Sequence, residues 1–127
     1  MKVIESGNSI NFVDQNNVFV GYELNSQCCE WADWTIEDIL LNSMVVFSYL
    51  KDKDSIYHDL DLEEYLFDKK FFKTMDNYDN DGGAMVIFRL ISGDKEKYLY
   101  LFNVQNGYYG HGFTVKIDDK VVKEGLI

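Results

Sequence analysis

Proline, separated cysteines and long apolar runs are all missing from this sequence. The 127 residues contain no proline, which removes a common marker of linkers, and the two cysteines, Cys28 and Cys29, are adjacent. Because a disulfide between neighbouring residues is strained, we expect reduced thiols and a cytoplasmic location. No run of about 18 apolar residues occurs, so we expect no transmembrane helix. The first residues, 1–5, reach an acid without an apolar stretch and so predict no secretory signal.

Basic residues are also scarce. The chain has 12 Lys and Arg against 22 Asp and Glu, a formal net charge of −10. The acidic excess lies in residues 1–81, because residues 82–127 carry five acids and six basic residues. Such a field repels nucleic acid and anionic lipid and attracts basic proteins. We therefore expect no nucleic acid and no membrane among the partners; the alternative is that the charge only maintains solubility.

The stretch from residue 84 to residue 117 predicts a three-stranded antiparallel meander. Residues 84–91 form a nearly continuous apolar run, typical of a strand buried on both faces, and Ser92-Gly93-Asp94 predicts the first turn. Residues 97–105 alternate, and Asn106-Gly107 is a strong hairpin signal before the return strand, 108–117.

The predicted hairpin turn sets a register for the last two strands of the meander. It pairs Phe102 with His111 and Tyr100 with Phe113. Gly110 and Gly112 would then leave a shallow trough beside Leu99 and Leu101. The trough predicts either ordinary packing or a docking surface.

The rest of the chain predicts short strands and a helix. Residues 10–24 favour a β-hairpin. Residues 59–67 favour a helix, because Asp59 or Asp61 can cap it and Leu62, Tyr65 and Leu66 form an apolar stripe. We expect a single α+β domain over residues 1–127, mainly an antiparallel β-sheet of five to seven strands with one or two short helices.

Two segments have the composition of metal or nucleophile sites. Zinc sites commonly space cysteines by two to four residues, whereas adjacent cysteines such as Cys28 and Cys29 point to opposite sides of an extended chain. The segment 77–82 imitates the start of a calcium loop, but its twelfth position is Phe88, where a glutamate is needed. We therefore expect no metal and no cofactor.

Three short segments resemble a known group of domains. Gln27-Cys28-Cys29-Glu30, Ile36-Glu37-Asp38-Ile39 and Asn106-Gly107-Tyr108-Tyr109 resemble motifs of small uncharacterised phage and bacterial domains. Those domains carry Gln-x-Cys-Cys-Glu, whereas Gln27 directly precedes the cysteines here. The resemblance runs over most of residues 18–117 through these pieces. It implies an α+β fold dominated by antiparallel sheet and a mobile-element or conflict setting, and it implies no activity.

The charge and the lack of a catalytic constellation favour a binding module that is not an enzyme. We expect an acidic protein that captures and neutralises a basic protein partner, most concretely an immunity or inhibitor protein for a toxin such as a nuclease. The expected contact residues are acids and aromatics: Glu30, Trp31, Asp33, Trp34, Asp59, Asp61, Glu63, Glu64 and Tyr108. One alternative is a small-ligand-sequestering phage or mobile-element protein with a pocket at the loop 28–34. The other is an enzyme using Cys29 or His111, although the sequence locates no base or orienting partner for a cysteine nucleophile.

Overall fold

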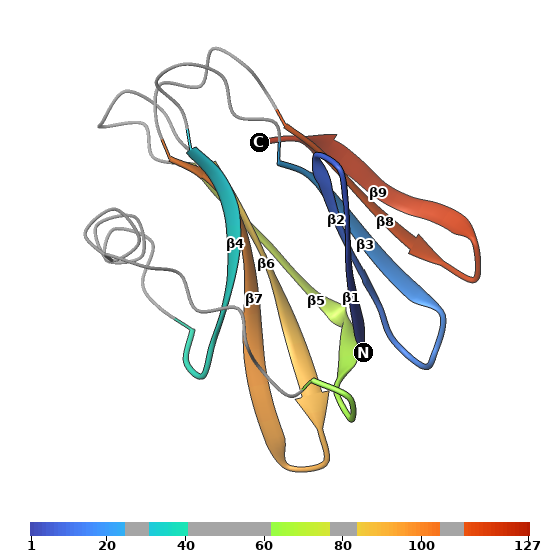
Figure 1. Cartoon of the computed structure of the whole chain (residues 1–127). Coiled ribbons are helices and arrows are strands. Elements are labelled where there is room, and N and C mark those ends of the chain that lie inside the picture. The colour runs from blue at the N-terminus through green and yellow to red at the C-terminus, as the bar shows by residue number, and fades with distance from the viewer. Residues whose placement is uncertain (25–30, 41–61, 77–83, 105–110) are drawn as a thin grey trace.

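The computed structural model describes residues 1–24, 31–40, 62–76, 84–104 and 111–127, which contain β-strands and their connections (Figure 1). The nine described strands are β1 (Lys2–Ser6), β2 (Ser9–Val13), β3 (Val18–Glu23), β4 (Trp31–Glu37), β5 (Leu66–Asp76), β6 (Ala84–Ser92), β7 (Lys95–Val104), β8 (Gly112–Ile117) and β9 (Lys120–Leu126). The predicted α+β class, with one sheet of five to seven strands and one or two helices, is therefore wrong: the described part is all-β, holds no helix and has nine strands in two sheets. It accordingly contains no helix that could cross a membrane.

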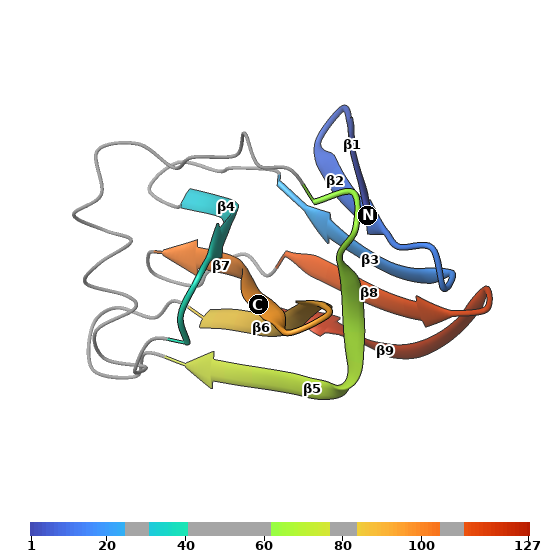
Figure 2. The ribbon, with the colours of Figure 1, turned by 90° about the horizontal axis from the view of Figure 1, so that it is seen from below.

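The strands form two antiparallel sheets that pack face to face (Figure 1, Figure 2). One sheet has the order β1-β2-β3-β8-β9 and the other β4-β7-β6-β5. Across the interface, the rings of Phe12 and Trp34 meet edge to face with centroids 5.0 Å apart, and the Tyr22 hydroxyl donates to the carbonyl oxygen of Phe102 at 2.9 Å. The molecule is thus a β-sandwich whose core is made by the inner faces of both sheets.

The predicted helix over residues 59–67 is also wrong in the part that the structure describes. Residues 62–65 form a turn, closed by a hydrogen bond from the Tyr65 amide to the Leu62 carbonyl at 3.0 Å, and β5 begins at Leu66. Leu62, Tyr65 and Phe67 are all buried in the sandwich core. An extended chain after the turn buries these side chains against both sheets, whereas a helix would gather them on one stripe. The predicted caps Asp59 and Asp61 lie outside the described residues.

The meander is half correct. β6 and β7 form the predicted hairpin: Ser92 pairs with Lys95, and Gly93 has the positive φ of 62° that a two-residue turn needs. β8, however, pairs with β3 and β9 in the other sheet. The predicted pairs of Phe102 with His111 and of Tyr100 with Phe113 are therefore wrong. The Asn106-Gly107 turn lies outside the described residues.

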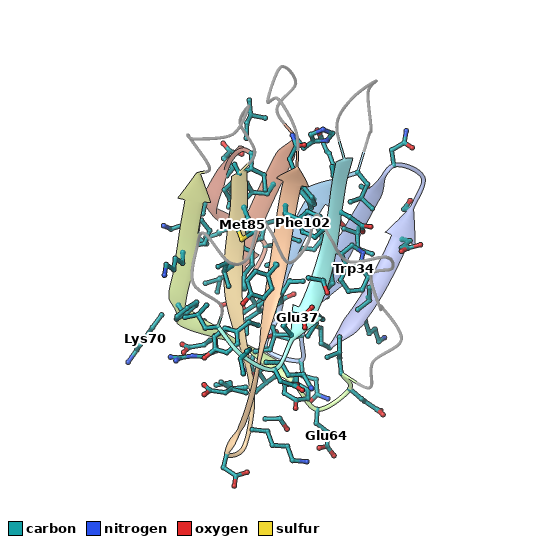
Figure 3. All side chains as sticks on the ribbon, turned by 90° about the vertical axis from the view of Figure 1, so that its left-hand side faces the viewer. Trp34, Glu37, Glu64, Lys70, Met85 and Phe102 are labelled. Atoms are coloured by element: carbon teal, nitrogen blue, oxygen red, sulfur yellow. The ribbon has the colours of Figure 1, made fainter. Side chains whose placement is uncertain are left out.

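The predicted meander places β8 beside β7, but the strand that pairs with this edge of β7 is β4. Trp34 pairs with Leu101 and Ile36 with Leu99, so the trough predicted beside these leucines is wrong and both are fully buried. The alternate residues of the same sheet, which include Met85 and Phe102, are equally buried and point away from the five-stranded sheet (Figure 3). β6 is therefore buried on both faces over residues 85–88, as the apolar run predicted, and β7 over residues 98–103, whereas Arg89 and Ile91 are partly exposed.

Candidate functional site

The structure divides the predicted contact residues between the interior and the surface. Trp34 is 2% exposed and packs on Phe12, so it belongs to the core and presents no surface to a partner. Strand alternation explains this, because Ala32, Trp34 and Ile36 all turn inward along β4. The structure describes the backbone of Trp31 in β4. Four further predicted residues lie outside the described residues: Glu30, Asp59, Asp61 and Tyr108.

Three other acids stand at the surface or near it. Asp33 is half-buried on β4, and its Oδ1 accepts a hydrogen bond from the Trp34 amide at 2.8 Å. Glu63 and Glu64 are exposed in the turn that precedes β5. Asp38, which was not among the predicted contact residues, follows β4 with its side chain 79% exposed. We call Asp38, Glu63 and Glu64 the acidic end.

The turn that carries Glu63 and Glu64 is attached to the five-stranded sheet at two points. The Met1 ammonium donates to the carbonyl oxygens of Leu62 and Glu63, each at 2.9 Å. The Phe67 amide donates to Asp14 Oδ2 at 2.9 Å. Both contacts involve a charged group, which strengthens a hydrogen bond. The backbone under the two glutamates is therefore held in place while their side chains remain in solvent.

A polar hollow of about 440 Å³ opens beside these glutamates. Its lining combines both signs of charge and consists of Glu63, Glu64, Tyr65, Ser92, Lys95 and Lys97. The Lys97 ammonium donates to Asp38 Oδ1 at 2.5 Å and lies 5.9 Å from the centroid of the Tyr65 ring. The hydrogen bond to Asp38 raises the pKa of Lys97, against the opposing effect of burial. Lys97 is thus charged and paired, and the hollow can accept a cationic group at its glutamate wall.

The sequence did not predict a second, apolar cavity of about 220 Å³ between β5 and the pair β8 and β9. Four phenylalanines, Phe67, Phe71, Phe72 and Phe88, line it from the four-stranded sheet. Val18, Val20, Val115 and Ile117 line it from the other sheet, and Asp68, Lys69, Val122 and Lys123 complete it. One local signal was visible in the sequence: two apolar pairs, 66–67 and 71–72, enclose the polar triplet 68–70 and interrupt the strand alternation.

That interruption is a bulge in β5. Phe67 pairs with Leu90 and Phe72 with Phe88, so five steps along β5 match two steps along β6. Arg89 organises the bulge: its Nε and Nη2 donate to Asp68 Oδ2 at 2.9 and 2.6 Å, and its guanidinium carbon lies 4.9 Å from the Phe71 ring centroid. The hydrogen bond from Arg89, followed by one from the Lys70 amide, lowers the pKa of Asp68. The Asp68 carboxylate is therefore ionised and already engaged.

His111, the candidate base of the enzyme alternative, lies in the interior. It is 2% exposed, and its amide and carbonyl bond to those of Ile127 at 2.8 and 3.0 Å. Its Nδ1 lies 3.2 Å from the carbonyl oxygen of Glu23. This position joins the chain end to β3. Cys29 lies outside the described residues, and within the described ranges no three His, Cys, Asp or Glu side chains are grouped as metal ligands.

No protein-family model, curated protein or solved structure matches this chain. The resemblance to small phage and bacterial domains therefore stays a prediction. Of the three segments that carry the resemblance, residues 27–30 and 106–109 lie outside the described residues. Ile36 and Glu37 of the remaining segment lie in β4.

Proposed function

We propose that this protein is an acidic binding module that captures and neutralises a basic protein, most concretely as an immunity or inhibitor protein for a toxin such as a nuclease. One observation supports the proposal above the others. The exposed carboxylates of Glu63, Glu64 and Asp38 gather beside a polar hollow, on a turn whose backbone is held by the rest of the fold.

The described charges are arranged unequally around the four-stranded sheet. Glu37 and Glu64 lie toward the end of the sheet at which the hollow opens, and Lys70 lies beside β5 (Figure 3). Five exposed lysines lie on the edge strands β5 and β9: Lys69, Lys70, Lys73, Lys120 and Lys123. A basic partner that approaches this protein is turned toward the acidic end and away from the lysine-bearing edges. Such orientation raises the rate of association more than it raises affinity.

The hollow offers a place for an arginine or lysine side chain of the partner. In the lining of the hollow, Lys97 is engaged with Asp38, and the side chains of Lys95, Glu63 and Glu64 are exposed. A cation placed between the two glutamates gains charge-assisted hydrogen bonds without displacing the Asp38 and Lys97 pair. The proposal therefore places the strongest contacts of the partner at residues 63 and 64.

The test uses two double variants with the same change in net charge. Glu63→Lys with Glu64→Lys alters the acidic end, and Glu5→Lys with Glu124→Lys alters exposed positions on β1 and β9. The tagged proteins are used to isolate partners from a lysate at low and high salt, and bound proteins are quantified by mass spectrometry. We expect a basic protein that binds the wild type and the β1 and β9 variant, and that is lost from the Glu63 and Glu64 variant and at high salt.

The control decides between a local site and total charge. Equal loss in both variants would mean that net charge alone attracts the partner. Retention in both would place the contact elsewhere and contradict the proposal.

A further inference from the structure

We propose that the apolar cavity between β5 and β9 is a binding site for a small amphiphilic carboxylate. The hydrocarbon body of the ligand occupies the cavity, and its carboxylate meets the ammonium groups of Lys123 and Lys69 at the mouth. This site is separate from the acidic end and goes beyond the capture of a basic protein.

The cavity exists because the bulge in β5 changes which way its side chains point. Phe67 and Phe72 are five residues apart, so in a regular strand they would point to opposite faces. The three extra residues of the bulge bring both rings to the inner face, where each meets Phe88 edge to face, with centroids 5.8 and 5.5 Å away. The bulge thus builds an aromatic wall on the inner face of the four-stranded sheet.

A second bulge lies across the cavity in β9. Val115 pairs with Lys123 and Lys116 with Val121, so Val122 is an extra residue without a position opposite it in β8. Val122 and Lys123 both line the cavity. β5 and β9 are the edges of their sheets and lie on the same side of the sandwich (Figure 2), and residues of both strands line the cavity. Bulges are concentrated at sheet edges and beside functional sites, where they redirect side chains.

The size of the cavity limits the apolar part of the ligand. An apolar cavity of about 150 Å³ holds benzene, so in proportion about 220 Å³ holds a body of about eight or nine carbon atoms. Aromatic and aliphatic side chains supply most of the wall, and few polar groups are needed to orient a ligand in such a site. A medium-chain or phenyl-substituted carboxylic acid satisfies this limit.

The charge at the mouth selects an anion, although the chain as a whole carries −10. The Lys123 ammonium lies 3.9 Å from the centroid of the Phe72 ring, directly at the cavity wall. Lys69 is the second lysine of the lining. Asp68, the carboxylate of the same lining, is bonded by two donors of Arg89. A ligand carboxylate therefore meets two ammonium groups and one carboxylate that is already neutralised.

Octanoate is the probe for this site, with octanol and octylamine as its neutral and cationic counterparts. Binding to the full chain is measured by calorimetry and by changes in the amide NMR spectrum. We expect octanoate to bind more tightly than octanol and octylamine to bind least. Lys123→Gln should weaken octanoate by about tenfold, because one charge-assisted hydrogen bond is lost, and should leave octanol unchanged.

Two neighbouring valines provide a matched pair of variants. Val122 lines the cavity and is 51% exposed, whereas Val121 is 50% exposed and lies outside the lining. Val122→Trp should fill the mouth and abolish binding, and Val121→Trp should keep it. Both positions are exposed, so both variants should fold, which the NMR spectrum of the free protein checks.

Several results would overturn the proposal. They are the absence of octanoate binding to the wild type, equal binding to the two tryptophan variants, and equal affinity for octanoate and octylamine. Binding of an acidic peptide with a terminal phenylalanine in place of octanoate, lost in Val122→Trp, would reassign the cavity to a protein partner. Octanoate binding should be the same in the Glu63→Lys, Glu64→Lys variant, so this site and the acidic end are tested independently.

Discussion

The carboxylate of Asp14 joins the two sheets through the backbone amide of Phe67. Asp14 lies between β2 and β3, and its Oδ2 accepts the hydrogen bond from Phe67 at 2.9 Å, at the start of β5. Its Oδ1 accepts from the amides of Asn16 and Val18, both at 2.9 Å, and so shapes its own turn. One buried side chain thus fixes a turn in one sheet and the first residues of a strand in the other.

Replacing Asp14 with asparagine should destabilise the fold strongly. Both carboxylate oxygens face N–H donors, so an amide group places a donor against a donor wherever it is oriented. The loss of a charge-assisted hydrogen bond and the burial of an unsatisfied donor together cost about 3 kcal/mol in the free energy of unfolding. Urea denaturation of Asp14→Asn measures this loss.

The control for that variant is Asp119→Asn in the β8–β9 turn. Asp119 is exposed and has a φ of 66°, a conformation that asparagine tolerates. This change should cost less than about 0.5 kcal/mol. Equal stability of the two variants would show that the bridge between the sheets does not stabilise the fold.

Asp68 should make the stability of the protein depend on pH in the acidic range. Its pKa in the folded protein lies below the ordinary value of 3.8, chiefly because Arg89 donates hydrogen bonds to it. A group whose pKa is lowered by folding stabilises the protein above its unfolded pKa, and this contribution is lost as the pH falls through the folded pKa. Asp68→Asn should therefore lose less stability than the wild type as the pH falls from about 5 to about 2.

The control for Asp68→Asn is another aspartate-to-asparagine change, at a position outside the ion pair with Arg89. Asp94→Asn, in the exposed β6–β7 turn, serves this purpose. It should follow the wild-type dependence on pH in urea denaturation. If the stability of Asp68→Asn depended on pH in the same way as that of the wild type, the pair with Arg89 would add nothing to stability.

Trp34 should act on stability and not on recognition. Truncating it to alanine removes a large side chain that packs edge to face on Phe12 in the core. Such a change typically costs about 3–5 kcal/mol. Thermal and urea denaturation measure it, with Leu126→Ala, which is 73% exposed, as the surface control. A Trp34→Ala protein that keeps wild-type stability and loses a partner would restore Trp34 as a contact residue.

The charge proposal, with Glu63 and Glu64 among the contact residues, could be formed from sequence, whereas the surroundings of these two glutamates could not. The excess of acids in residues 1–81 is visible without a structure. That Glu63 and Glu64 share a hollow with Lys97, and that Lys97 pairs with Asp38, depends on bringing three distant segments together. Trp34 shows the opposite case. An aromatic residue beside acids suggested a surface contact, and only the pairing of β4 shows that its side chain faces the core.

The sequence by itself determined the hairpin within residues 10–24, the two strands at the start of the meander and the tight turn between those strands. Gly93 has a positive φ in the turn where glycine was expected, and the apolar run 84–91 and the alternation that begins at residue 97 marked β6 and β7. These features depend on the conformational preferences of a few neighbouring residues. The prediction of a helix at 59–67 is wrong for the described residues 62–67, because their apolar side chains suit a helical stripe and a buried turn with a strand equally well. Packing against the core favours the turn and the strand.

Only the tertiary structure decided which strands are neighbours beyond the two local hairpins, β2–β3 and β6–β7. Residues 97–105 and 112–117 look like one hairpin, yet β7 pairs with β4 and β8 pairs with β3, in different sheets. The cavity has the same origin, since the bulge in β5 is marked in the sequence but the bulge in β9 that faces it is not. Local sequence sets the propensity of a segment for a strand, whereas its partners are set by which arrangement buries the most apolar surface across the whole chain.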